Sequence, residues 1–132
     1  MILDTSALVA ILYGEPEAAL YTQIIHNADI CRISVANYVE LSMVIENQIG
    51  PAGMRQVETF FRRAGIVIEP VTLEHGELAQ QAFIDFGKGR HKASLNFGDC
   101  FAYSLAKSTG EPLLYKGNDF IQTDIVGAMP NT

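Results

Sequence analysis

The sequence predicts an α/β fold: a central, mostly parallel sheet covered by helices on both faces, in a three-layer α/β/α sandwich. Two observations predict it. Short apolar segments of strand character alternate with helical segments, and the chain has 132 residues, of which 48% are hydrophobic and 18% charged. This length and composition suit one domain with a buried core. We find no internal repeat, low-complexity tract or linker, so we expect a single domain over residues 1–132.

The first half of the chain opens with an apolar run that stops at Asp4, which is typical of a short buried strand. Glu15-Pro-Glu17 has the acids and the early proline of a helix start. Ser34 is a favourable N-cap, and Gly50 marks the end of the helix that Ser34 begins. The expected elements are strand 1–3, helix 7–12, helix 15–27, strand 30–33 and helix 34–49.

In the second half, Gly65 closes a helix and is followed by Ile66–Val71, a β-branched segment that is buried in character. Thr72 and Asn96 are both favourable N-caps. A glycine and a proline at 110–112 end the helix that Asn96 begins. The expected elements are helix 52–64, strand 66–71, helix 73–86, helix 96–108, strand 113–115 and a last short strand at 124–126.

Two carboxylates follow predicted strands directly. Asp4 ends the first strand, and Asp119 lies just past the strand at 113–115. Ligands of parallel sheets bind beyond the carboxyl ends of the strands, so both side chains should lie at one edge. Asp4 could instead cap the first helix, and Asp119 could be an ordinary turn residue.

Further carboxylates lie on or near helices. Glu40 has apolar helical neighbours, which predicts a desolvated carboxylate unless it lies at the edge of the apolar stripe and reaches water. Asp99 fits a capping box with Asn96, and an acid there suits the helix dipole. Capping and catalysis are compatible for Asp99, because the first turn of its helix points toward the same sheet edge. Asp124 is a weaker candidate, which could simply start the last strand.

If these acids converge, their charges need compensation. Four ionised carboxylates about 5 Å apart repel by roughly 3 kcal/mol per pair at an effective dielectric near 20. Either protons or a divalent cation must then bind. Oxygen ligands without His or Cys suit Mg²⁺ or Mn²⁺, which are typical of phosphoryl-transfer sites.

The charge distribution restricts where a polyanion could bind. The net charge is −6, with −5 in residues 1–50 and −1 in the rest. An acidic chain is a poor non-specific nucleic-acid binder. A short basic cluster, Lys88, Arg90, His91 and Lys92, directly precedes Asp99. It could guide an RNA backbone to the acids, or it could be only a solvated loop.

Four blocks of residues also support a comparison with a known family. They are Asp4-Thr-Ser-Ala-Leu8, Val39-Glu-Leu41, Leu95-Asn-Phe-Gly-Asp-Cys-Phe-Ala-Tyr103 and Leu114-Tyr-Lys-Gly-Asn-Asp-Phe120, the last followed by Thr123-Asp124. In this order and spacing, which cover essentially the whole chain, they resemble the PIN-domain ribonucleases. More narrowly, they resemble the VapC toxins of bacterial toxin–antitoxin pairs. The Asn-Phe-Gly-Asp-Cys block, with Gly89-Arg-His91 before it, is the most specific part.

The resemblance implies a parallel α/β/α fold and an endoribonuclease that depends on Mg²⁺ or Mn²⁺ and hydrolyses RNA with metal-activated water. By motif position, its catalytic and metal-binding acids would be Asp4, Glu40, Asp99 and Asp119. Ser6 would orient Asp4 or a metal-bound water. Asn118 stands where the family often has another acid, so we take Asp119 as the ligand and Asp124 as the reserve. Lys116 would be a further RNA contact.

The resemblance also implies partners. The RNA substrate would be a single-stranded loop, where the phosphate is accessible. A small VapB-like antitoxin would bind over the helices and block the site, and apolar residues at 35–61 could form its groove, unless they only pack on the sheet. A homodimer and larger toxin–antitoxin assemblies are also expected.

Two other functions remain open at this point. A phosphatase or phosphotransferase of the haloacid-dehalogenase type also uses an aspartate after the first strand, but it usually has a second aspartate where this chain has Ser6. An inert module of the same fold could act only by binding a protein.

The remaining features suit a cytoplasmic protein. Cys31 and Cys100 are too few for a disulfide framework or a zinc site, so we expect two buried thiols in a reducing compartment. No apolar run approaches the ~20 residues that span a bilayer. The early acid at Asp4 argues against a signal peptide.

Overall fold

The computed structural model describes residues 1–129. Its strands are β1 (Ile2–Leu3), β2 (Arg32–Ser34), β3 (Val67–Glu69) and β4 (Leu113–Leu114). They form one sheet in the order β3–β2–β1–β4, and every neighbouring pair is parallel. Ile2 lies opposite Arg32 on one side and Leu113 on the other. β1 is therefore central, with its carboxyl end between those of β2 and β4.

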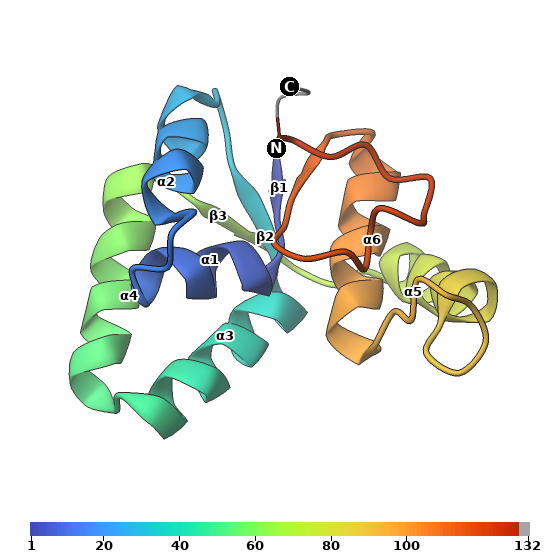
Figure 1. Ribbon diagram of the computed structural model, residues 1–132, viewed down its shortest axis with the longest axis horizontal. Coiled ribbons are helices and arrows are strands. Elements are labelled where there is room, and N and C mark those ends of the chain that lie inside the picture. The colour runs from blue at the N-terminus through green and yellow to red at the C-terminus, as the bar shows by residue number, and fades with distance from the viewer. Residues whose placement is uncertain (130–132) are drawn as a thin grey trace.

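Helices cover both faces of this sheet. They are α1 (Thr5–Leu12), α2 (Ala18–Asn27), α3 (Val35–Gln48), α4 (Pro51–Ala64), α5 (Leu73–Phe86) and α6 (Phe97–Thr109). Figure 1 shows α1 to α4 on one side of the strands and α5 and α6 on the other. The predicted α/β/α sandwich is confirmed.

Alternate residues of the central strands belong to two separate cores. Leu3 and Leu114 pack with residues of α1 to α4. Ile2 and Leu113 pack with residues of α5 and α6. All four side chains are fully buried. Because successive side chains of a strand point to opposite faces, even two-residue strands tie both helical layers together.

Helix caps place the ends of the helices. Ser34, Thr72 and Asn96 are confirmed as N-caps, and each side chain accepts a hydrogen bond from a backbone N–H of its helix. The structure differs at 15–17, where a helix was predicted. There α2 begins only at Ala18, and Glu17 makes no side-chain cap bond.

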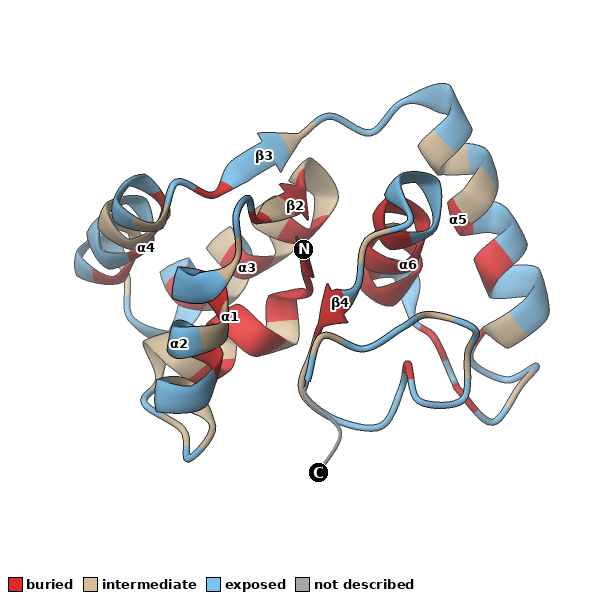
Figure 2. Cartoon of the chain, turned by 90° about the horizontal axis from the view of Figure 1, so that it is seen from above, coloured by how far each residue is buried: buried red, intermediate tan, exposed pale blue. Residues whose placement is uncertain are grey.

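Two strand predictions need correction. The segment 66–71 was predicted to be buried, but only Val67–Glu69 forms a strand, and Val67 and Ile68 are 40% and 39% exposed. The reason is its position at the edge of the sheet, where Figure 2 shows β3 as largely exposed. The last strand at 124–126 is wrong, because this region contributes only an isolated bridge between Leu113 and Gly127.

Two simpler expectations concern thiols and membranes. Cys31 and Cys100 are free and buried, as predicted. Within residues 1–129, every helix is too short or too polar to cross a bilayer.

Candidate functional site

The four predicted acids come from four separate elements. Asp4 follows β1 and is the N-cap of α1, and its N–H donates to the carbonyl of Leu114 in β4. Asp99 lies in the first turn of α6, Glu40 is in the middle of α3, and Asp119 lies in the loop after β4. Asp4 and Asp99 are buried, Glu40 is half-buried and Asp119 is exposed.

The electrostatics of the buried pair show that these acids are near one another. The pKa of Asp99 is raised from 3.8 to about 7, mainly by burial, with smaller contributions from the nearby charges of Asp4, Asp119 and Glu40 and against a hydrogen bond from Asn96. Burial likewise raises the pKa of Asp4 from 3.8 to about 6 against hydrogen bonds from Ser6, with Glu40 and Asp119 adding to the increase. The fold thus places Glu40 and Asp119 within electrostatic range of both buried carboxylates.

Ser6 connects Asp4 to the loop that carries Asp119. The Oδ2 atom of Asp4 accepts hydrogen bonds from the Ser6 N–H at 3.0 Å and from the Ser6 hydroxyl at 2.5 Å. The Ser6 hydroxyl oxygen accepts in turn from the N–H of Lys116 at 2.9 Å. One hydroxyl therefore orients the Asp4 carboxylate and anchors the start of the loop.

Glu40 lies at the edge of its apolar stripe, which the sequence left open as the alternative to a desolvated carboxylate. Its helical neighbour Met43 is 67% exposed, and Glu40 itself is half-buried. A hydroxyl holds the Glu40 carboxylate: Thr5 donates to its Oε1 at 2.5 Å. It also lies directly against Gly98, where a Cβ would come within 2.3 Å of its Oε2.

Asp99 forms the predicted capping box. Its Oδ2 accepts from the N–H of Asn96 at 3.0 Å, and the Asn96 side chain accepts from the Asp99 N–H at 2.9 Å. These bonds fix the rotation of the Asp99 side chain on the first turn of α6. The Asp99 carboxylate therefore caps α6 and is also one of the four predicted acids.

The donor set suits a hard divalent cation. Within residues 1–129, no salt bridge involves any of the four acids, so the buried charges of Asp4 and Asp99 lack a cationic partner. A buried unpaired carboxylate must bind a proton or a cation. In the arrangement described for 1–129, however, no three His, Cys, Asp or Glu side chains are close enough to hold one ion together. Asp119 and Glu40 would have to turn toward the buried pair.

The reserve acid, Asp124, is engaged elsewhere. Its Oδ1 accepts from the hydroxyl of Tyr103 at 2.7 Å, and its Oδ2 pairs with the ammonium group of Lys107 at 2.5 Å. The Lys107 hydrogen bond lowers the pKa of Asp124, opposite to the change at Asp4 and Asp99. The structure therefore does not bring Asp124 into the cluster.

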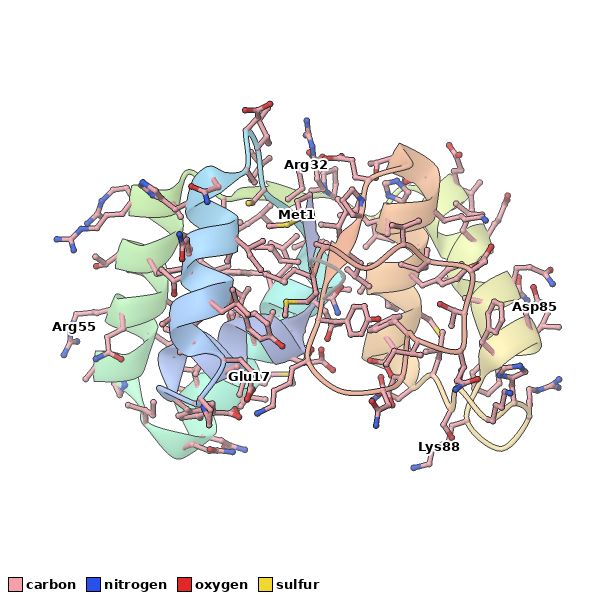
Figure 3. The ribbon with its side chains drawn as sticks, turned by 45° about the horizontal axis from the view of Figure 1, so that its top comes forward. Met1, Glu17, Arg32, Arg55, Asp85 and Lys88 are labelled. Carbon is pink, nitrogen blue, oxygen red and sulfur yellow. The ribbon has the colours of Figure 1, made fainter. Side chains whose placement is uncertain are left out.

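The basic residues divide into two groups. Lys88, Arg90 and Lys92 are exposed on the loop between α5 and α6, and Figure 3 shows Lys88 projecting from it. His91 is half-buried: its Nδ1 accepts from the N–H of Ala93, and its ring packs edge-on against a phenylalanine.

Lys116, predicted to contact RNA, instead forms ion pairs with Glu15 and Glu17. These hydrogen bonds raise its pKa. Both glutamates belong to the non-helical segment 15–17, and their side chains reach across to the loop after β4.

Sequence reasoning missed two polar residues beside Glu40. Asn37 is fully buried, and its amide donates to the carbonyl of Gly98 at 2.9 Å. Thr5 entered the sequence analysis only as part of the block Asp4–Leu8. A signal for Asn37 was present, because a polar residue three positions before Glu40 lies on the same helix face.

Comparison with known proteins identifies the family. The PIN domain family model matches residues 1–126. Ribonuclease VapC28 of Mycobacterium tuberculosis is 46% identical over 130 residues, which cover 98% of each chain. Ribonuclease VapC of Mycolicibacterium smegmatis is 43% identical over 125 residues, covering 95% of this chain and 97% of the relative.

Solved structures support the fold. The crystal structure of Mycobacterium tuberculosis VapC20, described as a sarcin–ricin loop cleaving toxin, matches with a TM-score of 0.78 at 16% identity and covers 98% of each chain. A toxin–antitoxin complex from Klebsiella pneumoniae contains a chain that matches with a TM-score of 0.72 at 15% identity, covering 97% of each.

Proposed function

The chain belongs to the PIN-domain family, among its VapC ribonucleases, and we propose that it is a Mg²⁺- or Mn²⁺-dependent endoribonuclease that acts as the toxin of a toxin–antitoxin pair. The observation that carries this proposal is the pair Asp4 and Asp99. Both are buried without a cationic partner among residues 1–129, and the charges of Glu40 and Asp119 act on both. We place its action in the cytoplasm.

Asp4, Glu40, Asp99 and Asp119 would hold the ion. When bound, such an ion acidifies water and neutralises charge that develops on the phosphoryl oxygens. Ser6 keeps Asp4 in one orientation, and the Asn96 cap does the same for Asp99. Burial of both carboxylates keeps bulk water from competing for their oxygens.

The RNA backbone would approach over the loop between α5 and α6. Lys88, Arg90 and Lys92 are exposed there and carry the positive charge that an acidic protein needs to attract phosphates. His91 shapes the loop through its packing rather than through its charge. Lys116 is already neutralised by two glutamates, so its contribution to RNA binding requires that these pairs open.

A cleavage assay tests the proposal and its two rivals. A structured RNA with single-stranded loops and a phosphate monoester are each incubated with the protein, with Mg²⁺ or with EDTA. We expect RNA cleavage only with Mg²⁺, and at least ~100-fold loss in Asp4→Asn. Hydrolysis of the monoester alone would indicate a phosphatase. No hydrolysis of either substrate would indicate a binding module.

A groove between α2 and α4 is the surface that we assign to the antitoxin. Its volume is about 850 Å³, and apolar residues of α1, α2 and α4 line it, including Ile11 and Phe60. Arg55 and Arg63 of α4 also line it, and Figure 3 shows Arg55 extending from that helix. An amphipathic antitoxin helix with acidic residues along its edge would complement both features. The groove overlaps the predicted 35–61 surface only in part, because residues of α4 line it but residues of α3 do not.

Binding of the protein encoded by the adjacent reading frame tests this surface. The double change Arg55→Glu and Arg63→Glu should weaken its binding at least tenfold by calorimetry, whereas Lys88→Glu, outside the groove, should not. If the wild type and both variants bind the partner equally well, this groove is not the antitoxin surface. The homodimer and larger assemblies stay predictions, to be checked by mass measurement of the toxin alone and with its partner.

A further inference from the structure

The hydroxyl of Thr5 connects two of the elements that carry the acids. Thr5 is the first residue of α1 and is 7% exposed. Its hydroxyl lies 2.5 Å from Oε1 of Glu40 and 3.2 Å from the carbonyl oxygen of Asn37, both on α3. A hydroxyl donates one hydrogen, so the shorter contact with the charged acceptor is the stronger bond.

The first turn of α6 closes the other side of Glu40. Both carboxylate oxygens of Glu40 would lie within 2.7 Å of a Cβ on Gly98, so the end of the Glu40 side chain would have to move to make room for one. The amide of Asn37 donates to the Gly98 carbonyl at 2.9 Å and so fixes this turn against α3. Glycine at 98 therefore lets the Glu40 carboxylate lie against the helical turn that carries Asp99.

We propose that Thr5, Asn37 and Gly98 form a clamp that holds the Glu40 carboxylate at the acidic cluster, with Thr5 as a positioning residue for it. The inference rests on the proposed function and deepens it. The clamp sets the relative positions of α1, α3 and α6, which carry three of the four acids. Groups that orient metal ligands commonly change metal affinity roughly 10- to 100-fold when they are removed.

Two matched pairs of variants test the clamp. Thr5→Val removes the hydroxyl at nearly constant shape, and Thr5→Ser keeps it. Gly98→Ala adds the Cβ that contacts Glu40, whereas Gly76→Ala adds one in α5 where nothing lies within 4 Å. Mn²⁺ binding without RNA is measured by calorimetry, Mn²⁺-dependent RNA cleavage is measured separately, and the melting temperature of the metal-free protein reports on folding.

We expect Thr5→Val and Gly98→Ala to weaken Mn²⁺ binding at least tenfold. Thr5→Ser and Gly76→Ala should bind within about twofold of wild type. Alanine is a better helix former than glycine, so Gly98→Ala should keep the thermal stability of the metal-free protein while it loses metal affinity. If Gly98 were needed only for folding, both quantities would fall together.

Wild-type Mn²⁺ affinity in both Thr5→Val and Gly98→Ala would overturn the clamp, and so would equal losses in Thr5→Val and Thr5→Ser. These results leave the proposed function standing if the wild-type protein binds Mn²⁺ and cleaves RNA. A wild-type protein that does neither would instead overturn the proposed function, and the clamp with it.

Discussion

Replacement of Asp99 by asparagine should stabilise the metal-free protein at neutral and alkaline pH while it abolishes RNA cleavage. Asp99 is 9% exposed, and burial raises its pKa from 3.8 to about 7. A group whose pKa is higher in the folded state contributes its full stability below its unfolded value. That contribution is lost as the pH rises through the folded value, so ionised Asp99 destabilises the fold at pH 8.

The size of the effect follows from the shift. About three pKa units at 1.36 kcal/mol each give up to about 4 kcal/mol between pH 4 and pH 8. The asparagine side chain does not ionise, and its carbonyl oxygen can still accept from the N–H of Asn96. For a domain of this size, that difference corresponds to a melting temperature roughly 10–15 °C higher for Asp99→Asn at pH 8, and to little difference near pH 4.

Thermal unfolding in EDTA from pH 4 to pH 8 measures this directly. Asp29→Asn is the matched control, since Asp29 is exposed and lies before the amino end of β2. The control should follow the wild-type curve. If Asp99→Asn and wild type lose stability in parallel over this range, Asp99 is not a buried, unpaired carboxylate, and the electrostatic argument for the cation site fails with it.

Three further outcomes follow from the same contacts. Millimolar Mg²⁺ should raise the melting temperature more at pH 8 than at pH 5, because protons compete for Asp4 and Asp99; equal shifts at both pH values would contradict this. Asp124→Asn should lower stability by about 1 kcal/mol through its lost partners but leave cleavage within about twofold; a large loss of activity would return Asp124 to the site. Changing the exposed loop residues Lys88 and Lys92 together to alanine should raise KM for RNA and reduce its salt dependence at unchanged kcat, as measured by initial rates at several salt concentrations.

The sequence was most informative where one local rule decides the outcome. Ser34, Thr72 and Asn96 were recognisable as N-caps because a cap depends only on residues within one turn. The strand-end rule for parallel sheets, which needs only the strand positions, predicted Asp4 and Asp119 at one edge, and the charge of Asp119 does act on Asp4.

Features that depend on distant partners were not predictable. Lys116 pairs with Glu15 across 101 positions of the chain, so this predicted RNA contact is engaged by a residue that the sequence assigned to a helix start. The exposure of Val67 and Ile68 depends on the place of β3 in the strand order, which the apolar pattern does not contain. In each case the residues involved were visible, but the partner that decides their role was not.

Capping and metal binding were alternative interpretations of Asp4 and Asp99 in the sequence, and the structure shows why a single carboxylate can do both. Each uses Oδ2 for the backbone of its own helix N-terminus. Within residues 1–129, the Oδ1 atom of each makes no hydrogen bond. The helix termini hold the two side chains in fixed orientations and partly offset their charge. One oxygen on each therefore remains for a cation, and burial raises the pKa of both carboxyl groups despite the hydrogen bonds that they accept.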